Sequence, residues 1–235
     1  MKLNYDLHTH TVFSHGKGSI EDNVIIAKQK GLKEIAICDH GPEHLAYALK
    51  RKNFPFMRSE CDRLSEKYGI KVLLGVEANL LDKSGRIDVL KDDEKFYDII
   101  LMGYHKMIKP KPKQFWFSLK TKIFTSKKQI EENTNAYINA INKYNIKVLT
   151  HLNCGIKVNI KRLVDACKEK DVLIELNGKR ISFTKEEIAY MKENNVKFVV
   201  NSDAHKPNNV GETNLGLNFI VKNNIDLKNV VNVSN

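Results

Sequence analysis

The feature that most constrains the fold is an alternation of short apolar runs with longer amphipathic segments. After the first run, the apolar runs are rich in Ile, Val and Leu and do not alternate with polar residues, which is typical of strands buried on both faces of a parallel sheet. The predicted strands are Lys2–His8, Glu34–Asp39, Lys71–Glu77, Tyr97–Gly103, Ile146–Thr150, Val172–Leu176 and Val196–Asn201. This pattern predicts an α/β fold with a parallel sheet. The 235 residues suffice to close that sheet into a barrel, with an open doubly wound sheet as the alternative.

The segments between these runs carry apolar residues at helical intervals. Ser19 stands three residues before Asp22, which signals a helix start, and Gly31 follows as a stop signal. Thr184 and Glu187 have the same spacing and predict a second helix start. The predicted helices are Ser19–Lys30, Phe56–Tyr68, Lys127–Tyr144, Ile160–Lys170 and Thr184–Asn194.

The segment Lys109–Lys122 combines proline, lysine and aromatic residues without a clear period. We expect a loop that passes over one end of the barrel and buries its own aromatic side chains. Stacking of nucleic-acid bases on these aromatics is the less favoured interpretation. No repeat, low-complexity tract or linker interrupts the sequence, so we expect a single domain over residues 1–235.

Composition narrows the cellular setting. No apolar run approaches the ~20 residues needed to cross a bilayer, and the N-terminus lacks a signal-peptide pattern, so a cytoplasmic protein without a membrane partner is expected. The cysteines have no CxxC spacing and are expected to be reduced and mostly buried: Cys38, Cys61, Cys154 and Cys167. The net charge of +11 comes from lysines spread along the chain. Such a surface is compatible with an anionic substrate and would attract nucleic acid weakly.

Histidines and carboxylates fall where the predicted strands end. Seven of the eight histidines do so, together with Glu77 and Asp203: His8, His10, His15, His40, His105, His151 and His205. Because the C-terminal ends of parallel strands gather on one rim of a barrel, these side chains should meet there. A single histidine at a strand end is usually a structural residue. Seven of eight histidines at strand ends are improbable by chance. His44 lies at no strand end and should face solvent or lie behind the others, and Asp39 should point away from His40.

Imidazole and carboxylate groups together predict a metal centre. They are suitable ligands for zinc, iron and manganese, and this set exceeds the needs of one ion. A bridging carboxylate such as Glu77 can hold two cations ~3.5–4 Å apart. We therefore expect two or three divalent metal ions, with zinc favoured over manganese or iron. The catalytic residues are expected among the ligands, namely Glu77, Asp203 and His205.

At these same residues the sequence resembles the PHP family, named for polymerase and histidinol phosphatase domains. The resemblance runs across almost the whole chain in family order and is greatest to the small stand-alone bacterial phosphatases. The matching segments are DLHTHTVFSHGKGS (6–19), ICDHGP (37–42), GVEANL (75–80), GYH (103–105), TH (150–151) and NSDAH (201–205). The resemblance implies a distorted seven-stranded, TIM-like (β/α)7 barrel. Two departures are Leu152 after His151, where the family often has proline, and ELNGKR (175–180), which matches only loosely.

The resemblance also implies how the ligands are shared. One metal would be held by His8, His10, Glu77 and Asp203. A second would share Glu77 and add His105 and His151. A third would be held by His15, His40 and His205. All nine family ligand positions are intact in this sequence.

These features predict a metal-dependent phosphatase that acts on a small phosphorylated substrate. Metals would lower the pKa of a bridging water towards ~7, and the resulting hydroxide would attack phosphorus in line. Lys179 and Arg180, which follow the sixth strand, could bind the outer phosphate oxygens or form a solvated basic pair. The sequence specifies no general acid, physiological substrate or oligomeric state.

The sequence favours three rival functions less. A phosphodiesterase or 3′ exonuclease would use the same metals and is permitted by the positive charge, but no nucleic-acid-binding module is recognisable. An amidohydrolase would favour a bridging lysine on a middle strand and an eighth strand, which the sequence lacks. A metal-binding regulatory protein without turnover is disfavoured by the complete ligand set. No glycine loop of the GxxxxGK[ST] type supports phosphotransfer.

Overall fold

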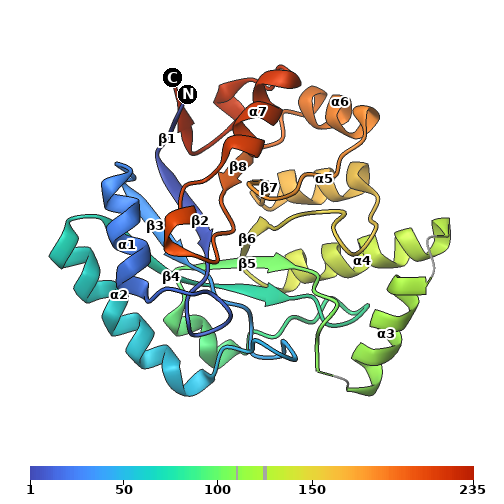
Figure 1. Cartoon of the computed structure of the whole chain (residues 1–235). Helices are drawn as coiled ribbons and strands as arrows, with labels where there is room; N and C mark the ends of the chain where they lie inside the picture. Colours follow the sequence, from blue (N-terminus) through green and yellow to red (C-terminus); the bar gives the residue numbers. More distant parts are fainter. Residues whose placement is uncertain (110, 124–125) are drawn as a thin grey trace.

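The computed structural model describes residues 1–109, 111–123 and 126–235, and a parallel sheet of seven strands forms its centre (Figure 1). Neighbouring strands follow in chain order: β2 (Tyr5–Thr9), β3 (Glu34–Ile37), β4 (Lys71–Asn79), β5 (Ile99–Gly103), β6 (Ile146–Leu149), β7 (Leu173–Asn177) and β8 (Phe198–Asn201). All six pairings are parallel. The predicted parallel sheet is confirmed. The helix between two strands carries the chain back to the same end of the sheet, so that the next strand can pair in parallel.

The first and last strands of the sheet, β2 and β8, meet at a seam. An isolated parallel bridge joins Thr9 and Ala204, beyond the end of β8. Side chains extend the seam, since Asn201 Oδ1 accepts the Leu7 N–H at 3.0 Å and Asp6 accepts the Ser202 N–H at 3.1 Å. The sheet is therefore a nearly closed, distorted barrel. This confirms the TIM-like fold and excludes the open doubly wound sheet.

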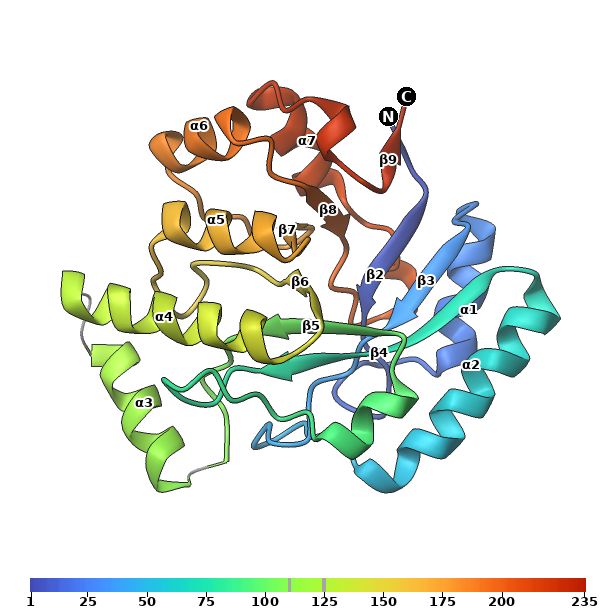
Figure 2. The same cartoon turned by 180° about the vertical axis from the view of Figure 1, so that it is seen from behind.

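Helices surround the sheet (Figure 2). The α-helices are α1 (Ile20–Gln29), α2 (Phe54–Tyr68), α3 (Pro112–Ile123), α4 (Lys127–Lys143), α5 (Ile160–Glu169), α6 (Lys185–Glu193) and α7 (Asn214–Lys222). Short 3-10 helices are η1 (Arg51–Asn53), η2 (Lys91–Phe96), η3 (Pro207–Asn209) and η4 (Leu227–Asn229). The predicted capping boxes form at Ser19 with Asp22 and at Thr184 with Glu187. Among the described residues, no helix combines the length and the apolar character that spanning a membrane requires.

Apolar residues fill the barrel and the space between barrel and helices. The barrel interior is a small cluster of Leu7, Ala36, Cys38, Ile99, Leu101, Val148 and Val199. Two larger clusters pack outside it, one under α1 and α2 and the other under α4 to α7. Three of the four cysteines are buried as expected, and Cys154 is half-buried. The apolar interior ends where the strands reach their C-terminal ends, and polar side chains follow there.

The prediction of a loop for Lys109–Lys122 is wrong. Apart from Pro110, which lies outside the described residues, this segment leads into helix α3, which lies on the outside of the molecule near α4 (Figure 1). Proline at the first helical position is preorganised for a helix start, a signal that the missing period obscured. The expected burial of the aromatics is also only partly correct. Phe117 packs on Tyr104, whereas Phe115 and Trp116 are 49% and 60% exposed.

The two ends of the described chain pair with each other, which the sequence did not predict. The segment predicted as one strand, Lys2–His8, is divided at Asn4, and β1 (Lys2–Leu3) pairs antiparallel with β9 (Val233–Ser234). Helix α7 was not predicted either. Its Gly216 lacks a side chain because a Cβ there would lie 2.7 Å from Val200 Cγ1 and 2.9 Å from the Leu176 carbonyl oxygen. Close packing on β7 and β8 therefore outweighs the low helix propensity of glycine.

Candidate metal centre

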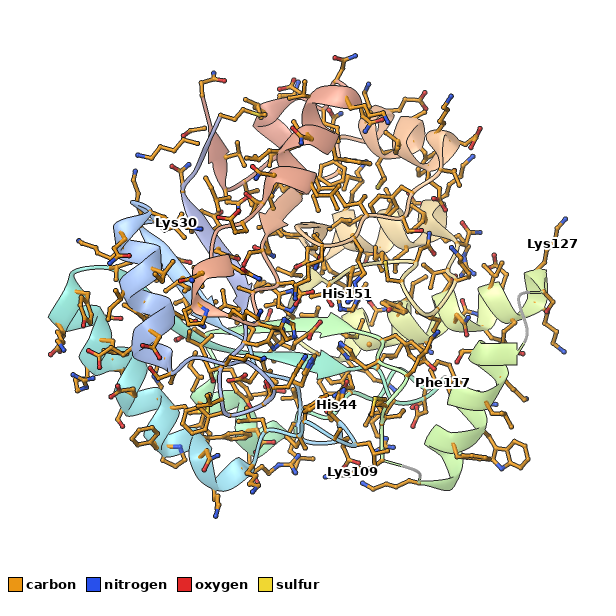
Figure 3. The ribbon with its side chains drawn as sticks, viewed as in Figure 1. Lys30, His44, Lys109, Phe117, Lys127 and His151 are labelled. Atoms are coloured by element: carbon orange, nitrogen blue, oxygen red, sulfur yellow. The ribbon has the colours of Figure 1, made fainter. Side chains whose placement is uncertain are left out.

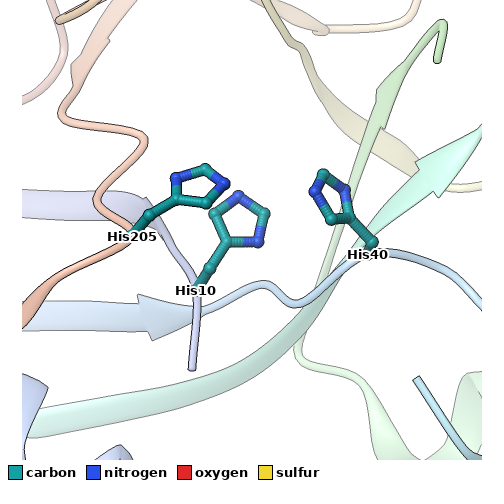
Figure 4. A group of neighbouring side chains, drawn as sticks. All are labelled: His10, His40 and His205. Atoms are coloured by element: carbon teal, nitrogen blue, oxygen red, sulfur yellow. The ribbon is translucent and has the colours of Figure 1, made fainter. Parts of the chain in front are cut away.

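The nine predicted ligands lie together on the rim formed by the C-terminal ends of the strands. His8 and Glu77 belong to β2 and β4, and the others stand just after β2, β3, β5, β6 and β8. Figure 4 shows three of them, His10, His40 and His205, with their rings side by side although they come from three separate segments. The parallel sheet brings residues from positions 8 to 205 into one cluster because each strand delivers its end to the same rim.

Glu77 is the centre of this cluster. Its carboxylate is buried and lies within 4 Å of a ring nitrogen of five histidines. The distances are 2.8 Å to His151 Nε2, 2.9 Å to His40 Nδ1, 3.4 Å to His8 Nε2, 3.4 Å to His105 Nε2 and 3.7 Å to His10 Nε2. On the β8 side, Asp203 Oδ1 lies 3.3 Å from His10 Nε2 and 3.3 Å from His205 Nδ1.

Three groups of side chains have ligand atoms within 4.8 Å of one another. They are His8, His10 and Asp203; His10, His40 and His205; and His40, Glu77 and His105. The first group agrees with part of the ligand set that the resemblance implies. The other two differ from it, because His40 approaches Glu77 and His105 as closely as it approaches His205. His15 completes the cluster by stacking on His40, with 4.8 Å between the ring centroids.

The unpaired ring nitrogens fit a bound cation. Within the described residues, the buried Nδ1 atoms of His10, His15 and His40 have no hydrogen-bond partner. The Nδ1 of His40 contacts the Glu77 carboxylate at 2.9 Å without hydrogen-bond geometry, and the Nε2 atoms of His8 and His10 face each other at 3.1 Å. Buried polar atoms normally have partners, so a cluster of converging lone pairs and carboxylates is suited to divalent cations.

Protonation favours the same conclusion. Burial and the nearby His10 lower the pKa of His15 to about 4, that of His205 to about 3, and that of His40 well below its usual value. These imidazoles are therefore neutral near pH 7, which is the form that binds metals. Although burial opposes ionisation, His105 and His8 hold the pKa of Glu77 well below its usual range. The rim thus combines three neutral imidazoles with an ionised carboxylate, while the carboxylates beside His8 and His151 raise the pKa of these two side chains.

A second buried carboxylate, Glu175 of β7, supports the cluster from behind and was not predicted as functional. Its Oε1 lies 2.7 Å from His8 Nδ1, and its Oε2 accepts the backbone N–H of His151 at 2.9 Å. Asn177 and Asn201 donate side-chain N–H groups to the same carboxylate. A carboxylate on the far ring nitrogen fixes the tautomer and orientation of a metal-binding histidine. The available sequence signal was a charged residue inside the apolar run Val172–Leu176.

Asp39 holds the loop that carries His15. It accepts the Thr11 N–H at 2.7 Å and the hydroxyl groups of Thr11 and Ser14 at 2.6 and 2.5 Å. Its carboxylate contacts this loop, while His40 next to it contacts Glu77. Asp39 therefore positions backbone, in agreement with the prediction that the two side chains diverge.

His44 is buried beside the cluster, so the alternative that it faces solvent is wrong. Its ring stacks on His40 with 4.8 Å between centroids and lies 5.8 Å from the ring of His105. Figure 3 labels His44 and His151 near the middle of the molecule. Tyr47, which was not predicted, covers His15 with a ring-centroid distance of 4.4 Å. The segment 41–47, which follows His40 and contains turns, places the side chains of His44 and Tyr47 over the rim.

The two predicted phosphate-binding residues differ in position. Lys179 Nζ lies 3.2 Å from Asp203 Oδ1 and 2.5 Å from His205 Nδ1, at the β8 edge of the cluster. Arg180 lines a cavity of about 190 Å³ in front of Glu77. Both basic side chains are exposed and border the centre.

Backbone strain and a glycine accompany the ligands. His151 and Asp203 have positive φ values of 30° and 53°, which non-glycine residues seldom adopt and which concentrate at functional sites. Gly103 packs against His151, and a Cβ at position 103 would be 2.4 Å from Thr150 Oγ1 and 2.9 Å from His151 Cε1. The space that His151 occupies therefore depends on glycine at position 103.

Comparison with known proteins decides the family. Residues 6–179 match the family model described as PHP domain. The chain belongs to the PHP family. The match contains seven of the nine cluster residues, while Asp203 and His205 lie beyond it, just after β8.

Curated relatives of this PHP protein match it over nearly its full length. A probable phosphatase of Caldanaerobacter subterraneus is 31% identical over 250 residues, which cover 100% of this chain and 89% of the relative. A probable phosphatase of a Thermoanaerobacter species is 32% identical and covers 94% of this chain and 86% of its own length. Family membership, these relatives and the ligand cluster identify the PHP protein as a metal-dependent phosphatase, an enzyme of the hydrolase class.

A solved structure shows the same fold. It is the histidinol phosphate phosphatase of Lactococcus lactis in complex with zinc, L-histidinol and phosphate. The TM-score is 0.64 with 15% sequence identity, and the match covers 96% of this chain and 95% of the other. At this identity the likeness concerns the fold alone.

Proposed function

We propose that this PHP protein hydrolyses small phosphate monoesters at a centre of two or three divalent cations, with zinc favoured over manganese or iron. The observation that carries the proposal is the convergence of seven histidines and two carboxylates on one rim around the buried Glu77. The Lactococcus structure, which contains zinc and phosphate, supports zinc and a small phosphorylated substrate. Residues 1–235 would act as one catalytic domain.

The ligand assignment that we propose follows the family pattern. His8, His10, Glu77 and Asp203 would hold one cation, and His105 and His151 would hold a second that shares Glu77. His15, His40 and His205 would hold a third. The unpaired Nδ1 atoms of His15 and His40 support a third position.

Bound divalent cations would supply hydroxide at neutral pH and neutralise the phosphoryl oxygens. In the hydrolysis, the water oxygen forms a bond to phosphorus while the ester P–O bond breaks, and the leaving alkoxide takes up a proton. Glu175 orients His8 through its Nδ1 atom. Lys179 and Arg180 would bind the outer phosphate oxygens, since Lys179 contacts Asp203 and Arg180 lines the cavity in front of Glu77. Glu77, Asp203 and His205 would be the residues nearest the reacting atoms.

The first test combines metal analysis with two model substrates. Protein purified without chelator should contain two to three equivalents of zinc, manganese or iron and should hydrolyse p-nitrophenyl phosphate in a chelator-sensitive way. Turnover of bis-p-nitrophenyl phosphate alone would instead favour a phosphodiesterase or exonuclease, which the +11 charge permits. Metal-loaded protein that hydrolyses neither compound nor single-stranded DNA would contradict the proposal and favour a regulatory protein.

A further inference from the structure

A second, larger cavity adjoins the metal centre. It measures about 410 Å³, and it shares five lining residues with the cavity in front of Glu77: His44, His105, Met107, His151 and Arg180. The smaller cavity of about 190 Å³ contains the carboxylates and most of the histidines. A phosphoryl group bound there would therefore direct its ester oxygen towards the larger cavity, which lies within the ~300–1,000 Å³ range of small-molecule sites.

The remaining walls of the larger cavity come from the segments after β5 and β6. Tyr104 and Lys106 follow β5, and Cys154 and Gly155 follow β6. Gly155 has φ +95°, and a Cβ at this position would lie 3.5 Å from Lys106 Cε, so the lysine side chain passes close over the glycine. Loops that follow barrel strands commonly determine which substrate a barrel enzyme accepts.

The lysine and arginine that line the larger cavity give it a positive charge. Lys106 and Arg180 both line it, and no Asp or Glu is among its lining residues in the described chain. Neither Lys106 nor Arg180 forms an ion pair with any described residue, whereas Lys179 is paired with Asp203. Arg180 also affects Cys154, whose thiol pKa burial raises and Arg180 lowers. Two basic side chains without acidic partners thus border the space beyond the phosphoryl site.

We infer that the alcohol released by this enzyme carries an anionic group of its own, a carboxylate or a second phosphate, which binds to Lys106 and Arg180. Arg180 lines both cavities, and its several N–H donors can contact this group as well as the phosphoryl oxygens. The inference rests on the proposed phosphatase function and deepens it by naming a substrate class. Guanidinium and ammonium groups favour carboxylate and phosphate oxygens, and the same field repels an ammonium group. A leaving group with a free amine would therefore be a poor substrate.

The test uses substrates that differ at the far end. Glycerol 3-phosphate and 3-phosphoglycerate differ by one carboxylate, propane-1,3-diol bisphosphate carries a second phosphate, and phosphoethanolamine carries an ammonium group. We expect kcat/KM for at least one of the two anionic substrates to exceed that for glycerol 3-phosphate by about fivefold to tenfold, as expected for partly exposed charge pairs. The difference should lie mainly in KM, because a remote contact binds substrate and transition state alike. The larger of the two anionic values distinguishes a carboxylate from a phosphate.

Variants test whether the two cations cause this preference. In the double variant Lys106→Gln with Arg180→Gln, the ratio of kcat/KM for the preferred anionic substrate to that for glycerol 3-phosphate should fall to about 1, whatever the absolute rates. Raised ionic strength should also lower this ratio in the unmodified protein, because salt screens interactions between exposed charges. The matched control is the double variant Lys197→Gln with Lys228→Gln. It removes two positive charges near the start of β8, at the end of the strand far from the metal centre, and should keep the ratio.

Three results would overturn the inference. Chelator-sensitive hydrolysis of glycerol 3-phosphate with an equal or lower rate on both anionic substrates would contradict it and leave the phosphatase proposal intact. An anionic preference that persists in the double variant would assign the preference to other residues. Absence of hydrolysis of every monoester would overturn the proposed function and this inference together.

Discussion

Two sets of buried carboxylates have similar burial and opposite protonation behaviour. The frame carboxylates are Asp6, Asp39 and Asp88, and the centre carboxylates are Glu77, Glu175 and Asp203. Burial raises the pKa of each frame carboxylate, and this is only partly offset by the nearby His10 at Asp39 and by hydrogen bonds from hydroxyl, amide and backbone N–H groups at all three. Burial acts in the same direction on the centre carboxylates, but neighbouring histidines hold their pKa values below the usual range.

The difference shows that the partners of a buried acid indicate its role better than its burial does. Neutral donors satisfy the frame carboxylates, which thereby hold loops and strand ends in place. Imidazoles surround the centre carboxylates and leave lone pairs that converge on the same space. Substitutions that remove one charge at a time should therefore affect stability in the first set and metal binding in the second.

The largest effect is expected at the shared carboxylate. Glu77→Gln keeps the size of the side chain but removes the charge that faces five histidines. We expect kcat/KM on p-nitrophenyl phosphate to fall by about 10³ or more, with fewer metal equivalents per chain. Steady-state kinetics and elemental analysis measure both, and circular dichroism should show an intact fold. Full metal content in an active variant would contradict the central position of Glu77.

A smaller effect is expected behind the ligands. Glu175→Gln replaces the charged acceptor of His8 Nδ1 with a neutral one. Loss of such a carboxylate typically costs ~10–100-fold in metal affinity. Competition with a chromogenic chelator measures the affinity. The control Glu169→Gln removes an exposed charge at the end of α5 and should leave the affinity unchanged, and equal affinities in both variants would exclude a positioning role for Glu175.

Substitution of a frame carboxylate should lower the stability of the protein and leave metal binding intact. Asp39→Asn leaves the N–H and hydroxyl donors of Thr11 and the hydroxyl of Ser14 with one poorer acceptor. We expect a loss of about 1–3 kcal/mol in the free energy of unfolding, because buried donors lose their partners. Urea denaturation measures the loss, and elemental analysis should find the metals retained. Loss of metals without loss of stability would remove the distinction between the two sets.

The smallest expected effect is a loss of stability of the metal-free protein at acidic pH. His15 and His44 have a pKa of about 4 in the folded chain, against 6.5 when unperturbed, because burial and neighbouring histidines disfavour the charged form. Between these values the unfolded chain binds more protons, so the stability of metal-free protein should fall as the pH drops from about 6.5 towards 4. Thermal melts of chelator-treated protein at a series of pH values measure this fall. His44→Gln should make it shallower, and a melting temperature that rises on acidification would contradict the expected sign.

Much of the centre could be predicted because parallel strands convert sequence position into spatial position. Every ligand candidate follows or ends a buried apolar run, and such runs place their C-terminal ends on one rim. The grouping of the ligands could not be predicted in this way. His40 approaches both Glu77, 37 positions away in the sequence, and His205, 165 positions away, and local sequence patterns contain no information about such contacts.

The elements that were missed depend on tertiary contacts. Glu175 stands in an apolar run, and only the imidazole of His8, 167 positions away in the sequence, explains a charge there. Helix α7 contains Gly216, which the contact with β7 and β8 requires although it weakens an isolated helix. The pairing of β1 with β9 joins the two ends of the described chain through two residues each, too few for a periodic signal. The cations of the larger cavity lie on exposed loops, where composition says little about position.

The seam between β2 and β8 determines when the centre can form. Its bonds join residues almost two hundred positions apart, from Asp6 to Ser202 and from Leu7 to Asn201. During synthesis from the N-terminus, His8 and His10 leave the ribosome almost two hundred residues before Asp203 and His205. Until then the first barrel strand has an open edge and its histidines lack their partners across the seam. A nascent chain of this protein therefore carries incomplete ligand sets until the segment after β8 has been synthesised and has paired with β2.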